Sequence, residues 1–544
     1  MKSVKAVVDY LKSGNVSYVF GIPAGSVNAF FDELYDTPEI TPIVTKHEGA
    51  AAYMAAAYTK YSKELSVCIG SSGPGGANLL TGAANAMREH LPILFLTGAV
   101  PVDTVGLNAS QELDAHPMYK SVTKYSKRVD HAEDLLDEIH KAVENALTGV
   151  PGPVHIAMPI DIQLAEIKEK SLPSFPQYTP LLPEDTVIKE TVEALSATKK
   201  GYIFAGQGIR DSVPNLLELA ERLQWPIVTS PQAKGLVPDH HPLLKGVFGF
   251  AGHDSASNLI NEGDFDTVLV VGSSLGETAT NNYNPNISKN KMMIQIDFDQ
   301  NVFNRKYAVN LPILGDTQIT LSSLNDGLQR LGYEQTLPTY ANRQLDAIND
   351  EYSTKNVLLR LQKLLPKDTR YSIDIGEFMA YVIHYMNVLE SDSFDINVHF
   401  GAMGSGIGSA IGSKLADDNR PSVSITGDGC FFMHGMELLT AKEYNIPVLF
   451  IVMNNARLGM VHHGHSLQYQ RVHERFAQEP VDIAALAKTL GVPSIHVDRM
   501  EELKAESIET LLNEEGPAIL EIALVDDHTP PMGDRVKFLS SFGK

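Results

Sequence analysis

The sequence predicts an α/β protein built from three doubly wound parallel-sheet domains. Three observations lead to this fold class. The chain has 544 residues, which is more than a single hydrophobic core usually serves. Short apolar runs alternate with helical stretches along the chain, as expected for parallel sheets with helices on both faces. Polar stretches near 168–183 and before 350 divide this alternation into three blocks.

Each expected strand is a short apolar run, and the expected helix at 48–58 is rich in alanine. The blocks predict a domain over 1–165, a linker over 166–184, a central domain over 185–335, a third domain over 350–530 and a tail over 531–544. The first block has strands at 66–69, 93–97 and 154–158 and helices at 48–58 and 77–89. The second has strands at 202–205, 268–271 and 293–296 and helices at 215–223 and 256–262. In the third, strands at 422–426 and 448–453 flank a helix at 436–444.

The composition narrows the classes of function. A net charge of −22 disfavours binding to nucleic acid, since a phosphate backbone requires a basic surface. Cys68 and Cys430 lie in apolar or glycine-rich stretches, which argues against disulfides and favours a reducing cytoplasm. The N-terminus lacks the apolar core of a signal peptide, and no run approaches the ~20 apolar residues that span a bilayer. We therefore expect a soluble cytoplasmic protein.

Two strand ends in the third block carry candidate cation ligands. The strand at 422–426 runs into Gly427-Asp428-Gly429, and the next strand ends in Asn454-Asn455. The strand–helix–strand unit brings both carboxyl ends to one edge of the sheet, where ligands of doubly wound folds bind. A carboxylate, an amide oxygen and a free backbone carbonyl suit Mg²⁺ or Ca²⁺ carrying a diphosphate. Each motif alone is usually an ordinary turn, so the prediction depends on their combination.

Four further segments complete a recognisable pattern. They are Gly21-Ile22-Pro23-Ala24-Gly25-Ser26, Lys46-His47-Glu48-Gly49-Ala50-Ala51, Ser72-Gly73-Pro74-Gly75-Gly76-Ala77-Asn78 and Gly401-Ala402-Met403-Gly404-Ser405-Gly406. The two glycine turns do not match the dinucleotide-binding Gly-x-Gly-x-x-Gly, which weakens a nicotinamide interpretation. With the cation motifs, the whole chain resembles the acetolactate synthase and pyruvate oxidase family of thiamine-diphosphate enzymes. The resemblance implies a pyrimidine-binding N-terminal domain, a central domain and a diphosphate-binding C-terminal domain.

The resemblance assigns roles on the diphosphate side. It implies that Asp428, the side chain of Asn455 and the carbonyl of Arg457 bind Mg²⁺. Further cofactor contacts are implied for Gly25, Met403, Gly429, Cys430, Gly459 and Met460. Cys430 stands where many relatives have Ser or Gly, and a role as a small apolar residue is equally open.

Glu48, Met403 and Gln111 acquire sharper roles from the same resemblance. Glu48 alone is an ordinary first-turn helix acid. In the family, a carboxylate hydrogen-bonded to the pyrimidine nitrogen promotes the imino tautomer, whose imine removes the thiazolium C2 proton. Met403 corresponds to the bulky residue that bends the cofactor, with a core methionine as the alternative. Gln111 resembles the substrate-side glutamine, although Ser110 stands where many relatives have Phe.

The reaction itself is less well determined. The implied chemistry is decarboxylation of a 2-oxo acid such as pyruvate, followed by carboligation as in acetolactate synthase, by protonation, or by oxidation through a flavin. His462 and His463 stand in the region where the anabolic acetolactate synthase has a tryptophan. They are either surface residues or proton shuttles near a lid. Residues 249–253 correspond to the central-domain loop that passes beside the flavin in flavin-containing relatives. FAD is nevertheless disfavoured, because residues 272–277 lack the arginine expected in the flavin-containing synthases.

The resemblance also implies a homodimer or homotetramer whose active site lies between subunits, with Glu48 of one chain facing the diphosphate domain of another. A non-catalytic regulatory subunit is the alternative from a different class. The intact Glu48, Asp428 and Asn455 argue against it.

Overall fold

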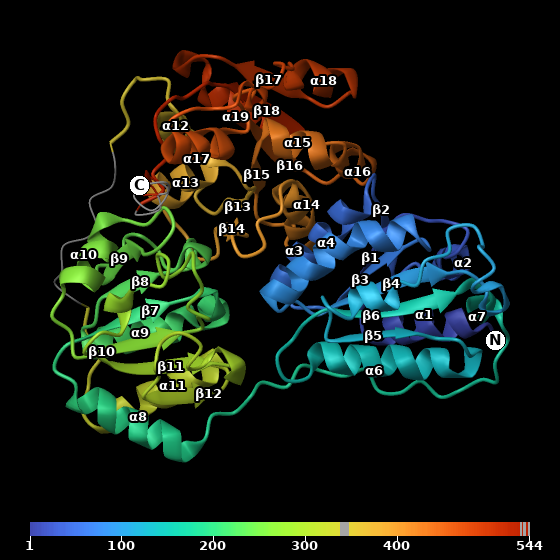
Figure 1. The fold of residues 1–544 in the computed structure, drawn as a ribbon, viewed down its shortest axis with the longest axis horizontal. Helices are drawn as coiled ribbons and strands as arrows, with labels where there is room; N and C mark the ends of the chain where they lie inside the picture. The colour runs from blue at the N-terminus through green and yellow to red at the C-terminus, as the bar shows by residue number, and fades with distance from the viewer. Residues whose placement is uncertain (338–346, 534–535, 537–539, 542–544) are drawn as a thin grey trace.

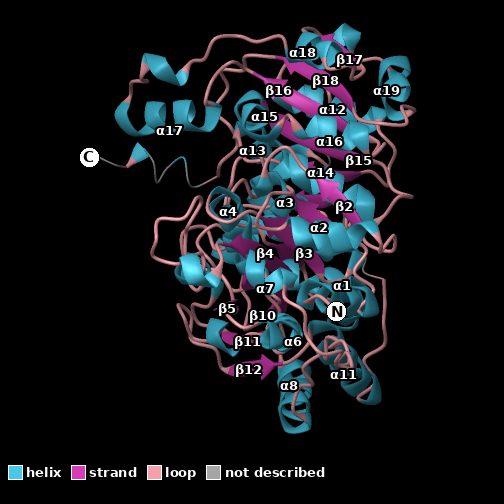
Figure 2. Cartoon of the chain, turned by 90° about the vertical axis from the view of Figure 1, so that its right-hand side faces the viewer, coloured by secondary structure: helices cyan, strands magenta, loops and turns pink. Residues whose placement is uncertain are grey.

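The strands form three separate sheets of six strands, and all neighbouring strands in them run parallel. The computed structural model describes residues 1–337, 347–533, 536 and 540–541. Figure 1 shows the N-terminal domain in blue to cyan, the central domain in green and the C-terminal domain in orange to red. In Figure 2 the strands lie between layers of helices. The predicted fold class, three doubly wound α/β domains, is confirmed.

The N-terminal sheet has the strand order β2-β1-β3-β4-β6-β5. Its strands are β1 (Tyr18–Gly21), β2 (Thr41–Val44), β3 (Ser66–Gly70), β4 (Ile93–Ala99), β5 (Tyr125–Arg128) and β6 (Val154–Pro159). Its helices are α1 (Ser3–Ser13), α2 (Asn28–Tyr35), α3 (Glu48–Ser62), α4 (Pro74–Glu89), α5 (His116–Tyr119), α6 (Leu135–Leu147) and α7 (Ile160–Leu164). The expected strands at 66–69, 93–97 and 154–158 are present as β3, β4 and β6, whereas β1, β2 and β5 were not predicted.

The C-terminal sheet repeats this topology, because its order β14-β13-β15-β16-β18-β17 is the same when strands are counted from its own first strand. The strands are β13 (Arg370–Ile373), β14 (Phe394–Ile396), β15 (Ser422–Gly427), β16 (Val448–Asn454), β17 (Ser494–Val497) and β18 (Ala518–Ala523). The helices are α12 (Thr354–Leu364), α13 (Glu377–Tyr385), α14 (Ser405–Ala416), α15 (Asp428–His434), α16 (Glu437–Glu443), α17 (Gly459–Tyr469), α18 (Ile483–Thr489) and α19 (Ala505–Leu512).

The central sheet follows a different order, β12-β11-β10-β7-β8-β9. Counted from its own first strand, this is the order of doubly wound folds that bind dinucleotides. The strands are β7 (Gly201–Ala205), β8 (Ile227–Thr229), β9 (Leu244–Val247), β10 (Thr267–Val271), β11 (Met292–Asp297) and β12 (Leu311–Leu314). The helices are α8 (Asp185–Ala197), α9 (Val213–Leu223), α10 (Asp254–Glu262) and α11 (Thr317–Arg330).

Residues 167–184 connect the N-terminal and central domains without forming a helix or strand, and the structure describes all of them. Much of the predicted tail, namely 534–535, 537–539 and 542–544, lies outside the described residues. Among the helices that are described, none combines the length and the apolar character needed to cross a membrane.

Helix α3 of the N-terminal domain packs directly against the C-terminal domain. It is buried from Glu48 to Thr59, as its alanine-rich sequence allows. On one side a Cβ on Gly412 of α14 would lie 2.0 Å from the carbonyl oxygen of Met54, and on the other a Cβ on Gly82 of α4 would lie 2.1 Å from Ala52 Cβ. A single hydrophobic cluster therefore includes residues of both domains, among them Ala51, Ala55, Ile407 and Ile411.

Charged side chains of all three domains meet around Tyr61. Lys60 of α3 forms ion pairs with Glu89 at 2.6 Å and with Asp395 at 2.7 Å. The guanidinium carbon of Arg370 lies 3.8 Å from the centre of the Tyr61 ring, and that of Arg210 lies 5.3 Å from it. Arg210 belongs to the central domain, so this junction orients that domain against the other two.

We predict that Gly412→Ala lowers the free energy of unfolding, by about 1–3 kcal/mol, because the new methyl group would meet the α3 backbone. Urea unfolding of the apo protein measures the change. Gly464→Ala is the matched control: it is also helical, but a Cβ there would meet no described atom within 4 Å. The control is expected to be stabilised by about 0.5–1 kcal/mol. Equal effects of the two substitutions would contradict the close contact.

Candidate functional site

The carboxyl ends of β15 and β16 lie side by side, as the sequence predicts. Gly427 of β15 is in register with Met453 of β16, so Asp428 and Asn455 leave neighbouring strands at one edge of the sheet. Asp428 begins α15 and is 5% exposed. Burial raises the pKa of its carboxyl above the ordinary value, and the nearby Glu377 carboxylate raises it further. A bound cation would offset both effects.

The loop after β16 presents its oxygen atoms through two consecutive Asx turns. Oδ1 of Asn454 accepts a hydrogen bond from Ala456 N at 3.3 Å, and Oδ1 of Asn455 accepts one from Arg457 N at 3.1 Å. Ala456 has a φ of 50°, in the left-handed region that non-glycine residues rarely adopt. Gln478 N donates to Ala456 O at 2.7 Å and anchors the loop. The surrounding structure therefore fixes this unusual backbone.

A buried aspartate ties the Met403 segment to the sheet. Asp374 follows β13, and its Oδ1 accepts hydrogen bonds from Gly404 N and Ile375 N, both at 2.8 Å. Its Oδ2 accepts one from the Thr426 hydroxyl at 3.0 Å. Burial raises the pKa of Asp374 to about 6. Sequence reasoning did not single out this residue, since its partners come from distant segments.

Met403 lies beside Gly429. This contact brings together two segments whose roles in one site the sequence indicated only through the family resemblance. A Cβ built on Gly429 would lie 3.3 Å from Met403 Cε and 3.6 Å from Leu458 Cδ2. The side chain of Met403 is half-buried, so it lines the site and is not enclosed in the core.

Cys430 follows Gly429 in the chain, and its side chain is buried. Its thiol donates a hydrogen bond to Ile375 O at 3.1 Å, and burial raises the pKa of the thiol well above its ordinary value. A buried neutral thiol is a poor nucleophile. Of the two roles left open by the sequence, the structure favours the small apolar one.

Glu377 is a site residue that sequence reasoning missed, because an acid in the first turn of a helix is common. It begins α13 and is 7% exposed. Its Oε1 accepts a hydrogen bond from Asn455 Nδ2 at 2.6 Å. Its Oε2 lies 3.2 Å from His463 Nε2, and Arg457 Nη2 lies 3.8 Å from Oε1. The carboxylate therefore sits between the candidate metal ligand and two basic side chains.

His462 and His463 lie on helix α17 and face different surroundings. His463 is buried against Glu377 and Arg457. It is therefore not the surface residue that was the simpler expectation. His462 is partly exposed, and partial burial together with the nearby Arg457 lowers its pKa. Met460 on the same helix packs against the hydrophobic cluster of the C-terminal domain.

The predicted N-terminal residues gather near the carboxyl ends of β1 and β3. Glu48 begins α3, and its Oε2 accepts a hydrogen bond from Asn78 Nδ2 at 2.9 Å. Ser72 N donates to Ser26 Oγ at 2.9 Å, which places the turn containing Gly25 beside the turn that begins α4. Gly25 is exposed, and a Cβ there would meet no described atom within 4 Å.

Gln111 is held at this edge by its backbone. Ser72 Oγ donates to Gln111 O at 2.7 Å, and Gln111 has a φ of 61°. A Cβ on Gly73, whose φ is 73°, would lie 2.9 Å from the same carbonyl oxygen. The side chains of Ser110 and Gln111 are exposed. Their position leaves them available to a ligand at the edge of the sheet.

Within one chain, the segment just before Glu48 meets the C-terminal domain at α15 and α16. Glu437 accepts hydrogen bonds from Lys46 N and His47 N, at 3.0 and 2.9 Å. The rings of His47 and His434 are 5.3 Å apart, and His434 Nδ1 lies 3.2 Å from Gly404 O. No hydrogen bond among the described residues joins Glu48 to Asp428 or Asn455.

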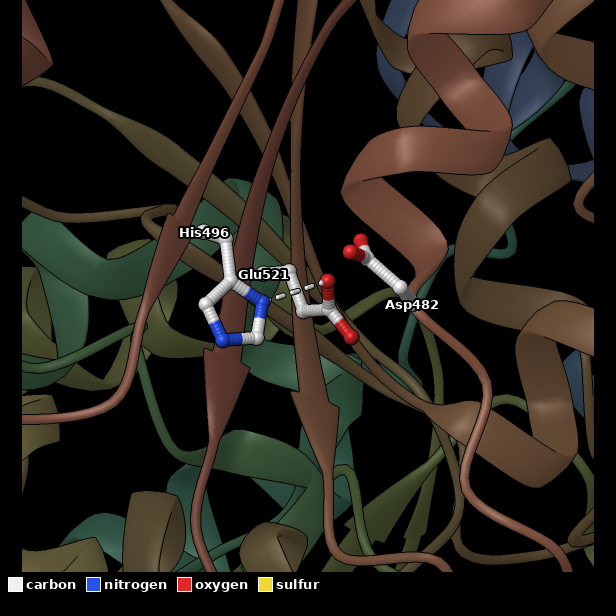
Figure 3. Close-up of side chains that lie close together, drawn as sticks. All are labelled: Asp482, His496 and Glu521. Atoms are coloured by element: carbon white, nitrogen blue, oxygen red, sulfur yellow. Dashed lines mark hydrogen bonds and ion pairs between the residues drawn. The ribbon is translucent and has the colours of Figure 1, made fainter.

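A second group of possible metal ligands lies at the far side of β16. Asp482, His496 and Glu521 place one ligand atom each within 4.8 Å of one another (Figure 3). Glu521 is fully buried and already accepts hydrogen bonds from Asn454 Nδ2 at 2.5 Å, Ala484 N at 2.9 Å and His496 Nδ1 at 2.9 Å. Asp482 caps α18. These residues therefore have a structural role, which is to hold the end of β16.

The central domain contributes a cavity of 1050 Å³ at the carboxyl ends of its strands. Gly208, Gln232, Asp297 and the 272–277 segment line it, and α3 contributes Lys60 and Lys63. Two of the lysines in this cavity are already paired, Lys60 with Glu89 and Asp395, and Lys63 with Asp211 at 2.9 Å. The 249–253 segment instead packs against α13, where His253 Nε2 lies 2.8 Å from His384 O.

The donor set fits a hard divalent cation. Asp428 supplies a buried carboxylate, and Asn455 Oδ1 and the Arg457 carbonyl each accept one hydrogen bond and keep a second lone pair. These are the oxygen ligands that Mg²⁺ and Ca²⁺ prefer. Gly429, the residue after Asp428, is glycine where a Cβ would lie 3.3 Å from Met403 Cε, so a larger residue would crowd this part of the site.

We predict that Asp374→Asn changes how stability depends on pH. The folded carboxyl has a pKa of about 6 and an ordinary value of 3.8, so between these values the folded state holds a proton that the unfolded state has lost. The stability of the parent should therefore fall relative to the variant as the pH rises from about 4 to about 6, by about 3 kcal/mol. Urea unfolding of the apo protein across this range measures it. A difference independent of pH would contradict the assignment.

Comparison with known families matches all three domains. The sequence matches the thiamine pyrophosphate enzyme N-terminal TPP binding domain over residues 1–118, the central domain over 188–324 and the C-terminal TPP binding domain over 374–522. Each match falls on one of the three sheets.

Individual relatives are similar over nearly the whole chain. The "probable acetolactate synthase large subunit" of Methanocaldococcus jannaschii is 31% identical, over 98% of this chain and 93% of that protein. The "acetolactate synthase isozyme 2 large subunit" of Escherichia coli K12 is 28% identical, over 96% of each. Among solved structures, a thiamine diphosphate-dependent 4-hydroxybenzoylformate decarboxylase of Rhodococcus jostii RHA1 has a TM-score of 0.85 at 20% identity, covering 97% of this chain and 100% of its own.

Proposed function

Because this chain belongs to the thiamine pyrophosphate enzyme family, we propose that it decarboxylates a 2-oxo acid and joins the remaining fragment to a second 2-oxo acid. Pyruvate is the proposed substrate and acetolactate the proposed product. The observation that carries this proposal is the joint presence of Glu48 and of the Asp428, Asn455 and Arg457 donor set. Relatives named acetolactate synthase large subunit, similar over nearly the full length, support the choice of reaction.

The C-terminal residues would bind the cofactor through a cation. We assign Mg²⁺ to the carboxylate of Asp428, the side-chain oxygen of Asn455 and the carbonyl of Arg457. The diphosphate would contact Gly429, Gly459 and the backbone at Cys430, and Met403 would support the ring system. When bound, thiamine diphosphate supplies a carbon nucleophile that adds to the 2-oxo acid and accepts the electrons released with CO₂.

Glu48 would move the proton that activates the cofactor. Asn78 holds Oε2 of this carboxylate at 2.9 Å, which fixes its orientation and leaves Oε1 to exchange a proton with the pyrimidine ring. Gln111, exposed at the same edge, would contact the substrate. Both cysteines are buried and free, which supports a cytoplasmic location.

A flavin-linked oxidase or dehydrogenase of pyruvate is the second candidate function. The 1050 Å³ cavity lies at the carboxyl edge of a sheet with the dinucleotide-binding strand order, which favours a site for FAD. The lack of an arginine in 272–277 and the pairing of Lys60 and Lys63 with carboxylates argue against it. An absorbance band near ~450 nm in the purified protein would show bound flavin. A flavin that takes no part in turnover would still be compatible with the first candidate function.

We predict that the protein with Mg²⁺ and thiamine diphosphate converts pyruvate to acetolactate and CO₂. Chromatography of the products measures this outcome. Acetaldehyde would instead indicate simple decarboxylation, and acetyl phosphate or acetate formed with reduction of an acceptor would indicate the flavin-linked reaction.

We predict that Glu48→Gln lowers the turnover of pyruvate by about 10²- to 10⁴-fold, because the amide cannot exchange the proton. Binding of thiamine diphosphate, measured by calorimetry, should change little. Glu64→Gln, just beyond the opposite end of α3, is the matched control and should keep parental turnover. Unchanged turnover in Glu48→Gln would contradict thiamine dependence.

We also propose that two chains share each active site. Hybrid dimers that pair a Glu48→Gln chain with an Asp428→Asn chain, isolated with two affinity tags, should regain about half of the parental activity, because one of two sites then receives neither lesion. Hybrids of Asp428→Asn with Asn455→Ala are the control and should remain inactive, since both lesions affect the diphosphate half. Sites contained within single chains would give no recovery in either hybrid.

A further inference from the structure

Glu377 occupies a position that the proposed chemistry does not use. It lies at the start of α13, directly behind Asn455, and its side chain is 7% exposed. A buried carboxylate is costly unless it is paired or hydrogen-bonded. Its surroundings therefore indicate what it does.

The amide of Asn455 is fixed from both ends. Its Nδ2 donates to Glu377 Oε1 at 2.6 Å, and its Oδ1 accepts from Arg457 N at 3.1 Å. A carboxylate can only accept, so it selects the orientation in which the amide NH₂ faces Glu377. The amide oxygen must then point away from Glu377, where it accepts from Arg457 N and keeps a second lone pair for a ligand.

Glu377 is itself held in place. His463 Nε2 lies 3.2 Å from Oε2, and Arg457 Nη2 lies 3.8 Å from Oε1. Arg457 is anchored in turn by Asp527, at 2.8 Å from its Nη1. A Cβ on Gly459 would lie 2.1 Å from Oε2, so the glycine at the start of α17 allows the carboxylate to approach.

We propose that Glu377 is a positioning residue that orients the amide of Asn455 so that its oxygen faces the divalent cation. This inference rests on the proposed function, since it takes Asn455 to be a cation ligand. Acceptors behind a metal ligand fix its orientation, and their loss typically lowers metal affinity by about 10- to 100-fold. The same carboxylate adds negative charge beside Asp428, which attracts the cation.

Calorimetric titration of Mg²⁺ into the apo protein with saturating thiamine diphosphate tests the proposal. Glu377→Leu should weaken Mg²⁺ binding by about 10- to 100-fold. Glu377→Gln keeps an acceptor for Asn455 and should bind within about threefold of the parent. Glu506→Gln, which changes an exposed carboxylate in the first turn of α19 in the same domain, is the matched control and should bind as the parent does. Thermal unfolding of each apo variant verifies folding. The electron paramagnetic resonance spectrum of bound Mn²⁺ reports the ligand geometry directly.

A charge swap tests the same contact without a large change in shape. Asn455→Asp alone would place the new carboxylate against that of Glu377, and the repulsion between them would distort the site. In the Glu377→Gln background, the glutamine NH₂ can donate to the new aspartate, so the double variant should bind Mg²⁺ more tightly than Asn455→Asp alone.

The outcomes separate the two claims. If the parent binds no Mg²⁺ with thiamine diphosphate, the proposed function fails. If the parent binds it and Glu377→Leu binds equally well, the positioning role is overturned. Equal weakening in Glu377→Gln and Glu377→Leu, or no rescue in the double variant, also overturns it.

Discussion

The close contact between α3 and α14 is the constraint on which the rest of the structure depends. α3 carries Glu48 at its first residue, and α14 follows directly from the Met403 segment. The two helices approach so closely that Gly412 has no room for a side chain. Because the contact is made by small side chains and backbone, it is stiff. It therefore fixes the position of Glu48 relative to the C-terminal domain of the same chain.

Buried charges organise the C-terminal part of the candidate site. Asp374, Glu377 and Asp428 are three buried carboxyls around one edge of a sheet. Backbone N–H groups and a hydroxyl satisfy Asp374, and His463 and Arg457 compensate Glu377. Asp428 accepts a hydrogen bond from Gly429 N at 2.8 Å but forms no ion pair among the described residues, and burial raises the pKa of its carboxyl. Such an arrangement is stable in its ionised form when a cation completes it.

The three domains share a fold class but differ in what their strand orders allow. The N-terminal and C-terminal sheets have the same order, whereas the central sheet has that of dinucleotide-binding folds. The central domain joins the others through the charged junction around Tyr61, next to its large cavity. Its architecture would permit a nucleotide ligand, but fold alone does not assign one.

The sequence by itself determined the fold class, eight of the strands and the neighbouring strand ends that carry Asp428 and Asn455, because the spacing of apolar residues and the turns at strand ends are local signals. It did not reveal the other described strands, most of which have only three or four residues, nor the six-residue β18. Tertiary structure alone decided the role of Glu377, the burial of His463 and the partners of Asp374. Each depends on segments distant in the chain that converge at one edge of a sheet, and no local pattern records that convergence.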